Sequence, residues 1–98
     1  GYVEHTLVSL GAKGMIYAGS GGVCRLHNQP VPVKSTVGAG DTALAAFLTG
    51  LQRGMAAQEA ARYAVAAGSA SVTLEGTDIV TPAMVERFLP EVSLRILR

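Results

Sequence analysis

An acidic residue follows two closely spaced glycines where the chain changes from extended to helical patterning. The run Gly38-Ala39-Gly40-Asp41 precedes Leu44, Leu48 and Leu51, which recur at helical spacing. A helix that begins here presents unpaired backbone N–H groups and the positive end of its dipole, and both attract phosphate. A carboxylate at the same place can take a proton from an attacking hydroxyl group. The run therefore predicts phosphoryl transfer, with amides for the phosphate and Asp41 as the base.

A purely structural role of Asp41 explains the same residues about equally well. Aspartate is favoured at helix starts because its carboxylate accepts hydrogen bonds from the unpaired amides, and glycine turns precede many helices. The surrounding sequence therefore has to decide between capping and catalysis.

Other nucleotide motifs fit less well. A P-loop needs Ser or Thr after a Gly-Lys pair, and here Lys13 precedes Gly14 with no hydroxyl residue after it. The dinucleotide pattern with alanine as its last member is satisfied formally by Ala43, but it sets Asp41 where a pyrophosphate would lie. That arrangement would place the Asp41 carboxylate against the negatively charged pyrophosphate, and the two would repel each other.

The elements around the glycine turn are expected to be three short strands, three helices and a last strand. Strands are predicted at 6–10, 15–18 and 23–26, and Pro30 and Pro32 enforce an extended connection after them. Helices are predicted from the glycine turn to about 51, from about 56 to about 72, and from 82 to 88 with Thr81 as N-cap. The tail 92–97 is expected to be an edge strand. This order indicates an α/β domain with one sheet flanked by helices.

The helix at 56–72 carries a stripe of alanine and glycine residues. Such a stripe lets another backbone approach closely, and we expect core packing or, in a truncated domain, a homodimer contact.

Composition limits the class of protein. The 98 residues suffice for one domain, and 49% hydrophobic with 15% charged residues is a globular composition. A net charge of +1 without a basic stripe argues against nucleic acid, and no apolar stretch approaches a membrane span. Cys24 has no partner for a disulfide, and His5 and His27 have none at metal-ligand spacing, so a cytoplasmic protein is expected. A start without methionine suggests a fragment.

Three motifs in order resemble the ribokinase-like (phosphofructokinase B) carbohydrate kinases. The run 36–42 is similar to the C-terminal signature of that family. The run 8–14 resembles its strand and glycine turn at the nucleotide, and 67–71 with 75–77 resembles the helix and loop beside the adenine. The resemblance covers nearly the whole chain. It implies the C-terminal, nucleotide-binding part of a three-layer ribokinase-like sandwich, residues 1–98, without the N-terminal substrate part.

The resemblance also implies roles for individual residues. Asp41 would be the catalytic base, and Gly38, Ala39 and Gly40 would form the anion hole. ATP, with Mg²⁺ on its phosphates, would be bound by Ser9, Leu10, Gly11, Ala12, Lys13, Gly14, Gly40 and Asp41. A monovalent cation such as K⁺ would be held by Ser35, Val37, Ser71, Leu74, Gly76 and Asp78.

Segments 35–41 and 84–92 look most like those of kinases of phosphorylated hexoses, such as 1-phosphofructokinase and tagatose-6-phosphate kinase. The function expected from this resemblance is ATP-dependent phosphorylation of a hexose phosphate. The alternative is a non-catalytic fragment that keeps the fold and some nucleotide affinity.

Overall fold

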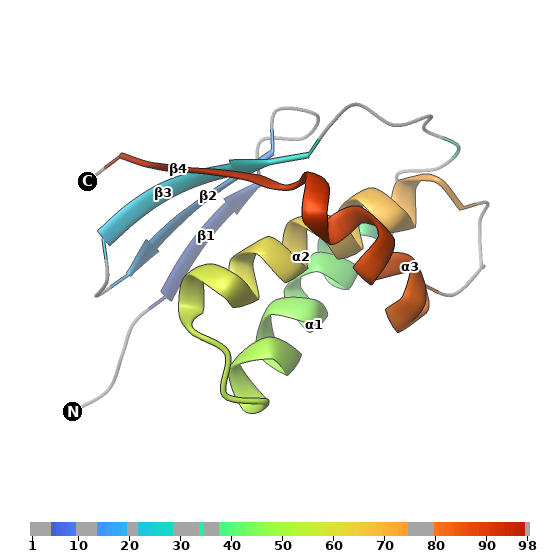
Figure 1. Cartoon of the computed structure of the whole chain (residues 1–98), viewed down its shortest axis with the longest axis horizontal. Helices are drawn as coiled ribbons and strands as arrows, with labels where there is room; N and C mark the ends of the chain where they lie inside the picture. The colour runs from blue at the N-terminus through green and yellow to red at the C-terminus, as the bar shows by residue number, and fades with distance from the viewer. Residues whose placement is uncertain are drawn as a thin grey trace.

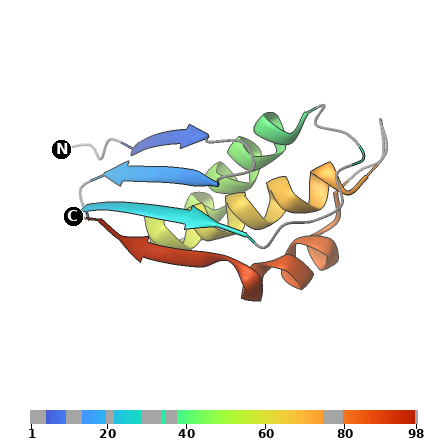
Figure 2. The ribbon, with the colours of Figure 1, turned by 90° about the horizontal axis from the view of Figure 1, so that it is seen from above.

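One antiparallel sheet lies against a layer of helices (Figures 1 and 2). The structure is a computed structural model, and it describes residues 5–9, 14–19, 22–28, 34, 38–74 and 80–97. The strands are β1 (His5–Ser9), β2 (Met15–Gly19), β3 (Gly22–His27) and β4 (Ser93–Ile96), paired in the order β1-β2-β3-β4. The helices are α1 (Ala39–Gln52), α2 (Ala57–Val72) and α3 (Pro82–Phe88), followed by the 3₁₀ turn η2 (Leu89–Glu91). The expected element order and mixed α/β class are confirmed.

The sheet buries the side chains that face the helices. Tyr17 and Cys24 are opposite each other in the β2–β3 register, and both are buried, together with Leu26. Residues at alternate positions, such as Arg25 and His27, are exposed on the outer face. Burial raises the pKa of the Tyr17 hydroxyl, with a smaller contribution from Cys24, and burial also raises the pKa of the Cys24 thiol.

The small residues of α2 pack against α1 inside the chain. The α2 alanines at 60, 61, 64, 66, 67 and 70 are all buried. A Cβ atom added to Gly50 of α1 would lie 3.1 Å from the Cβ of Ala60, which shows how closely the two helices cross. The stripe is therefore core packing, and it is not available as a dimer contact.

The C-terminal elements return the chain to the sheet. The hydroxyl of Thr81 accepts a hydrogen bond from the Met84 amide at 3.3 Å, which confirms Thr81 as the N-cap of α3. α3 ends at Phe88, and Pro90 lies within η2. Because proline needs no N–H partner in a first turn, it is compatible with this short 3₁₀ turn. The chain then enters β4, which pairs with β3 at one edge of the sheet as expected.

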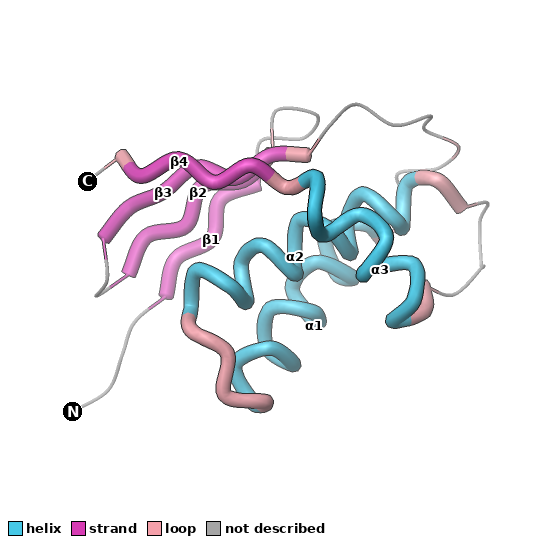
Figure 3. The backbone as a smooth tube through the Cα atoms, in the orientation of Figure 1, coloured by secondary structure: helices cyan, strands magenta, loops and turns pink. Residues whose placement is uncertain are grey.

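Figure 3 shows all three helices on the same side of the four strands. The described residues thus supply a sheet layer and one helix layer. None of the helices in the described part of the chain is long and apolar enough to cross a membrane.

Candidate active site at the start of α1

The first turn of α1 leaves its amides open. Gly38 is the N-cap, and its φ of 77° is left-handed, a conformation that favours glycine. The Thr42 amide donates to the Gly38 carbonyl at 2.9 Å and closes the first turn. The N-cap is a glycine and has no side chain that could cap α1. The amides of the first three helical residues have no acceptor within the helix. A Cβ added to Gly38 or Gly40 would meet nothing within 4 Å, which means that the space beside this turn is open.

Asp41 is the third residue of α1, and it is exposed. Its carboxylate makes no capping hydrogen bond to the helix, in contrast to the Thr81 side chain at the start of α3. The structure therefore does not show the capping role that competed with catalysis at the sequence level. The exposed Asp41 side chain and the amides without a helical acceptor thus belong to the same first turn of α1.

The end of α2 supports the start of α1. The two helices run antiparallel, so the C-terminal end of α2 lies beside the N-terminal end of α1 (Figure 1). A Cβ added to Gly68 would be 3.7 Å from the Cβ of Ala43. The Lys34 amide, in the segment leading to α1, donates to the Val72 carbonyl at 2.7 Å. These contacts fix the position of the turn relative to the core.

Two of the expected cation ligands lie at this end of α2. Ser71 is in its last turn, and its carbonyl accepts a hydrogen bond from the Leu74 amide at 3.1 Å. The neighbouring Ala70 carbonyl accepts from both the amide and the hydroxyl of Thr73. The other expected ligands, Ser35, Val37, Gly76 and Asp78, lie outside the described residues.

The expected nucleotide segment is described only at its two ends. Ser9 ends β1 and Gly14 precedes β2, at the end of the sheet nearer the start of α1 (Figure 2). Gly14 has a φ of 101°, and a Cβ there would lie 2.7 Å from the Cβ of His27, so the position requires glycine. The remaining positions, Leu10, Gly11, Ala12 and Lys13, lie outside the described residues.

The two histidines have different surroundings. His5 lies between the sheet and α1, with its Nδ1 2.8 Å from the Tyr17 hydroxyl and its ring 5.6 Å from that of Phe47. This is the structural role expected for it. His27 is exposed beside Arg25 and Arg95, a basic group that sequence spacing did not reveal. The alternation of Arg25 and His27 in β3 indicates that both side chains lie on one face of the sheet. Arg95 joins them only through the pairing of β3 with β4.

The described residues form an α/β domain with one antiparallel sheet, one helix layer and an exposed carboxylate in the first turn of α1. Residues 1–84 match the sequence model of the pfkB family carbohydrate kinases. The chain belongs to this family.

Related proteins agree with this assignment. The chain is 38% identical over 88 residues to the ATP-dependent 6-phosphofructokinase isozyme 2 of Mycobacterium tuberculosis, covering 90% of this chain and 26% of that protein. It is 27% identical over 96 residues to the 1-phosphofructokinase of Haemophilus influenzae, covering 97% and 31%. The structure of Escherichia coli phosphofructokinase-2 in complex with potassium superimposes with a TM-score of 0.81 at 31% identity, covering 88% and 28%. The chain thus spans roughly a quarter to a third of the length of these relatives.

Proposed function

We propose that this chain is the nucleotide-binding part of an ATP-dependent kinase that phosphorylates a hydroxyl group of a sugar or sugar phosphate. The observation that carries the proposal is the start of α1, where the Asp41 carboxylate is exposed, no side chain caps the helix and the adjoining space is open. A structural cap would have turned the carboxylate toward the amides. An uncapped helix start can instead receive the phosphate.

The proposed reaction divides the work between side chain and backbone. The Asp41 carboxylate accepts the proton of the sugar hydroxyl as its oxygen attacks the γ-phosphorus of ATP, and the bond to the β-phosphate oxygen breaks to release ADP. The amides of Gly38, Ala39 and Gly40 donate hydrogen bonds to the transferred phosphoryl group. The proton then leaves Asp41 for water.

Metal ions in this proposal come mainly with the nucleotide. The part of the chain that the structure describes contains no cluster of three or more His, Cys, Asp or Glu side chains able to hold a metal. Mg²⁺ would be held by phosphate oxygens of ATP and by water, because Asp41 serves as the base. When bound, Mg²⁺ neutralises charge on the phosphates.

Potassium is proposed at the end of α2, and the potassium complex of the Escherichia coli neighbour supports this idea. The carbonyl of Ser71 already accepts one hydrogen bond from the Leu74 amide, so K⁺ would be held by its second lone pair. Carbonyl groups of Leu74 and of the positions outside the described residues, together with Asp78, would complete the site.

The acceptor is proposed to be a hexose phosphate, because the names of both protein relatives specify a phosphofructokinase. Among hexose phosphate kinases, we propose that the reaction resembles that of a 1-phosphofructokinase. A homodimer in the cytoplasm belongs to the same proposal, with a contact other than the buried α2 stripe.

Replacement of Asp41 by asparagine tests the proposal in the protein expressed from its complete coding sequence. The amide keeps the shape of the side chain but takes up no proton, so kcat should fall by about a hundredfold or more while ATP affinity changes little. Glu59→Gln is the matched control, because Glu59 is the exposed third residue of α2 and forms only a 3.4 Å surface ion pair with Arg62. Equal turnover of both variants and the wild type would remove Asp41 from its role.

A non-catalytic fragment remains the second candidate, because the chain spans only about a quarter to a third of its relatives. The discriminating measurement is ATP binding alongside ATP-dependent phosphorylation of fructose phosphates. Nucleotide binding without phosphorylation of any sugar in the complete protein would favour the fragment.

A further inference from the structure

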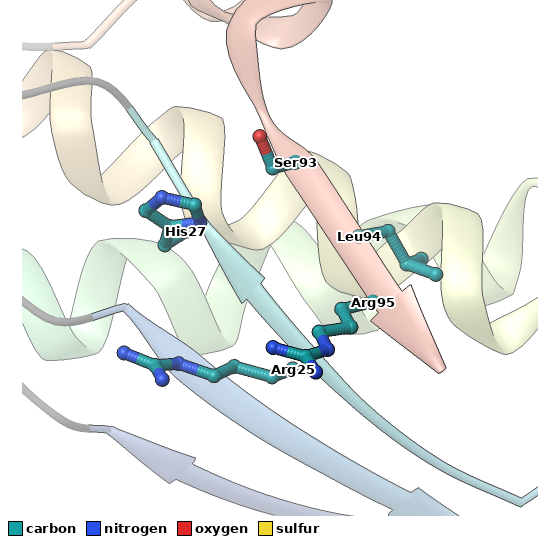
Figure 4. A pocket seen from close by; sticks show the side chains of 5 residues that line it. All are labelled: Arg25, His27, Ser93, Leu94 and Arg95. Carbon is teal, nitrogen blue, oxygen red and sulfur yellow. The ribbon is translucent and has the colours of Figure 1, made fainter. Parts of the chain in front are cut away.

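A groove on the outer face of the sheet gathers basic side chains from two strands. It is lined by Arg25, His27, Ser93, Leu94 and Arg95, and its volume is about 290 Å³ (Figure 4). We refer to it as the β3–β4 groove. The strand register sets Arg25 opposite Arg95 and His27 opposite Ser93. Opposite residues of an antiparallel pair point to the same face, so these four polar side chains share the outer surface.

The two arginines are an unfavourable cross-strand pair on their own. Like charges directly opposite each other destabilise a sheet, and none of the five lining residues is acidic. In Figure 4 both arginine side chains extend across the sheet in the same direction, away from β4. An anion bound beside Arg95 would be attracted by its guanidinium group and would reduce this repulsion. Arg25 also takes part in another interaction, so the main partners of a bound anion would be Arg95 and His27.

The donors of the groove suit a phosphate group in particular. The planar guanidinium group of arginine matches phosphate oxygens in pairs and stays charged at all relevant pH values. The His27 ring and the Ser93 hydroxyl provide further donors from the facing positions of the two strands. A volume of about 290 Å³ lies near the lower end for ligand pockets, which suits a small molecule better than a macromolecule.

We propose that the β3–β4 groove binds the phosphate group of a small molecule, either inorganic phosphate or a phosphate monoester. The groove lies on the face of the sheet opposite the helices, whereas Asp41 belongs to the helix layer (Figures 1 and 4). This site is therefore separate from the reaction proposed above, and either proposal can fail without the other.

An NMR titration of the protein expressed from its complete coding sequence tests the site. Inorganic phosphate is added at constant ionic strength, with chloride as the reference ion, and the His27 ring and arginine Nε–H signals are followed. We expect saturable shifts of His27, Arg25 and Arg95. Arg95→Gln should weaken binding about tenfold or more, as for loss of a charge-assisted hydrogen bond. Arg95→Lys should weaken it less, because the charge remains.

The matched control is Arg53→Gln, which removes the same charge from an exposed residue directly after α1. It should leave the phosphate affinity within about twofold, as a screened charge remote from the groove would. A parallel titration with glycerol phosphate distinguishes the two proposed ligands. Tighter binding than that of inorganic phosphate indicates a phosphate monoester as the ligand. Weaker binding indicates free phosphate.

Three results would overturn the proposal: equal shifts with chloride, equal weakening by Arg53→Gln and Arg95→Gln, or shifts restricted to the amides of residues 39–41.

Discussion

Replacement of Gly40 by alanine should make the protein more stable and less active. Gly40 is the second residue of α1, it is not among the described glycines with positive φ, and a Cβ there meets nothing within 4 Å. Alanine is favoured over glycine by about 1 kcal/mol in a helix interior and by less near an end. We therefore expect the free energy of unfolding to rise by about 0.5 kcal/mol.

The same methyl group should reduce phosphoryl transfer. It would occupy the open space in which the amides of the first turn are proposed to meet the phosphate. Loss of one well-placed donor to a transition state costs about a hundredfold to a thousandfold in rate, so kcat/KM should fall by about a hundredfold.

The comparison variant is Gly38→Ala, which adds the same methyl group in equally open surroundings. Because the φ of Gly38 is 77°, alanine there adds about 1–2 kcal/mol of strain, and both stability and activity should fall. Urea unfolding followed by circular dichroism gives the stabilities, and a coupled assay of ADP release gives kcat/KM. A Gly40→Ala kinase with unchanged kcat/KM would refute the reasoning, because the space beside the turn would then have no part in the reaction.

Three further predictions concern the sheet. Gly14→Ala should cost at least about 2 kcal/mol in urea unfolding, since it combines a φ of 101° with a contact 2.7 Å from the His27 Cβ, and a loss below about 0.5 kcal/mol would show that the turn adjusts freely. The raised pKa of Tyr17 means that the folded state holds this proton more tightly than the unfolded state. Its contribution to stability should be constant below about pH 10, where unfolded tyrosine titrates, and decline as the pH rises through the folded pKa. Tyr17→Phe should reduce this slope in unfolding measured against pH, and an unchanged slope would contradict it. Cys24 is fully buried with a raised thiol pKa, so an aromatic disulfide reagent should react with it only as fast as the sheet opens, and rapid modification of the native protein would contradict this.

Local chemical signals made much of this fold readable from the sequence. Thr81 followed by Pro82 marks a helix start by two independent effects, and the structure places α3 there. The alanine stripe of α2 predicted a close helix crossing, and the contact between Gly50 and Ala60 provides it. The short 3₁₀ turn η2 after α3 was not predicted, because Pro90 fits both the end of an α-helix and the first turn of a 3₁₀ helix.

The candidate site depended on geometry that residue types do not encode. Whether Asp41 caps the helix or faces outward follows from its position three residues after the N-cap, and the left-handed conformation of Gly38 sets that position. The β3–β4 groove depends on strand register, since Arg25 and Arg95 are 70 positions apart in the sequence and become neighbours only through pairing. The roles of the residues outside the described ranges stay predictions.

The outward surface of α1 has a consequence for work with this polypeptide in isolation. Leu44 and Leu48 follow Asp41 at spacings of three and seven residues, so they lie on the same side of the helix, and they are 51% and 52% exposed. At the edge of the described sheet, β1 pairs only with β2. An uncovered apolar stripe and an open strand edge each favour association between copies. A preparation of these 98 residues by themselves should therefore be prone to aggregate, and any partner that shields the leucines must leave the neighbouring carboxylate accessible.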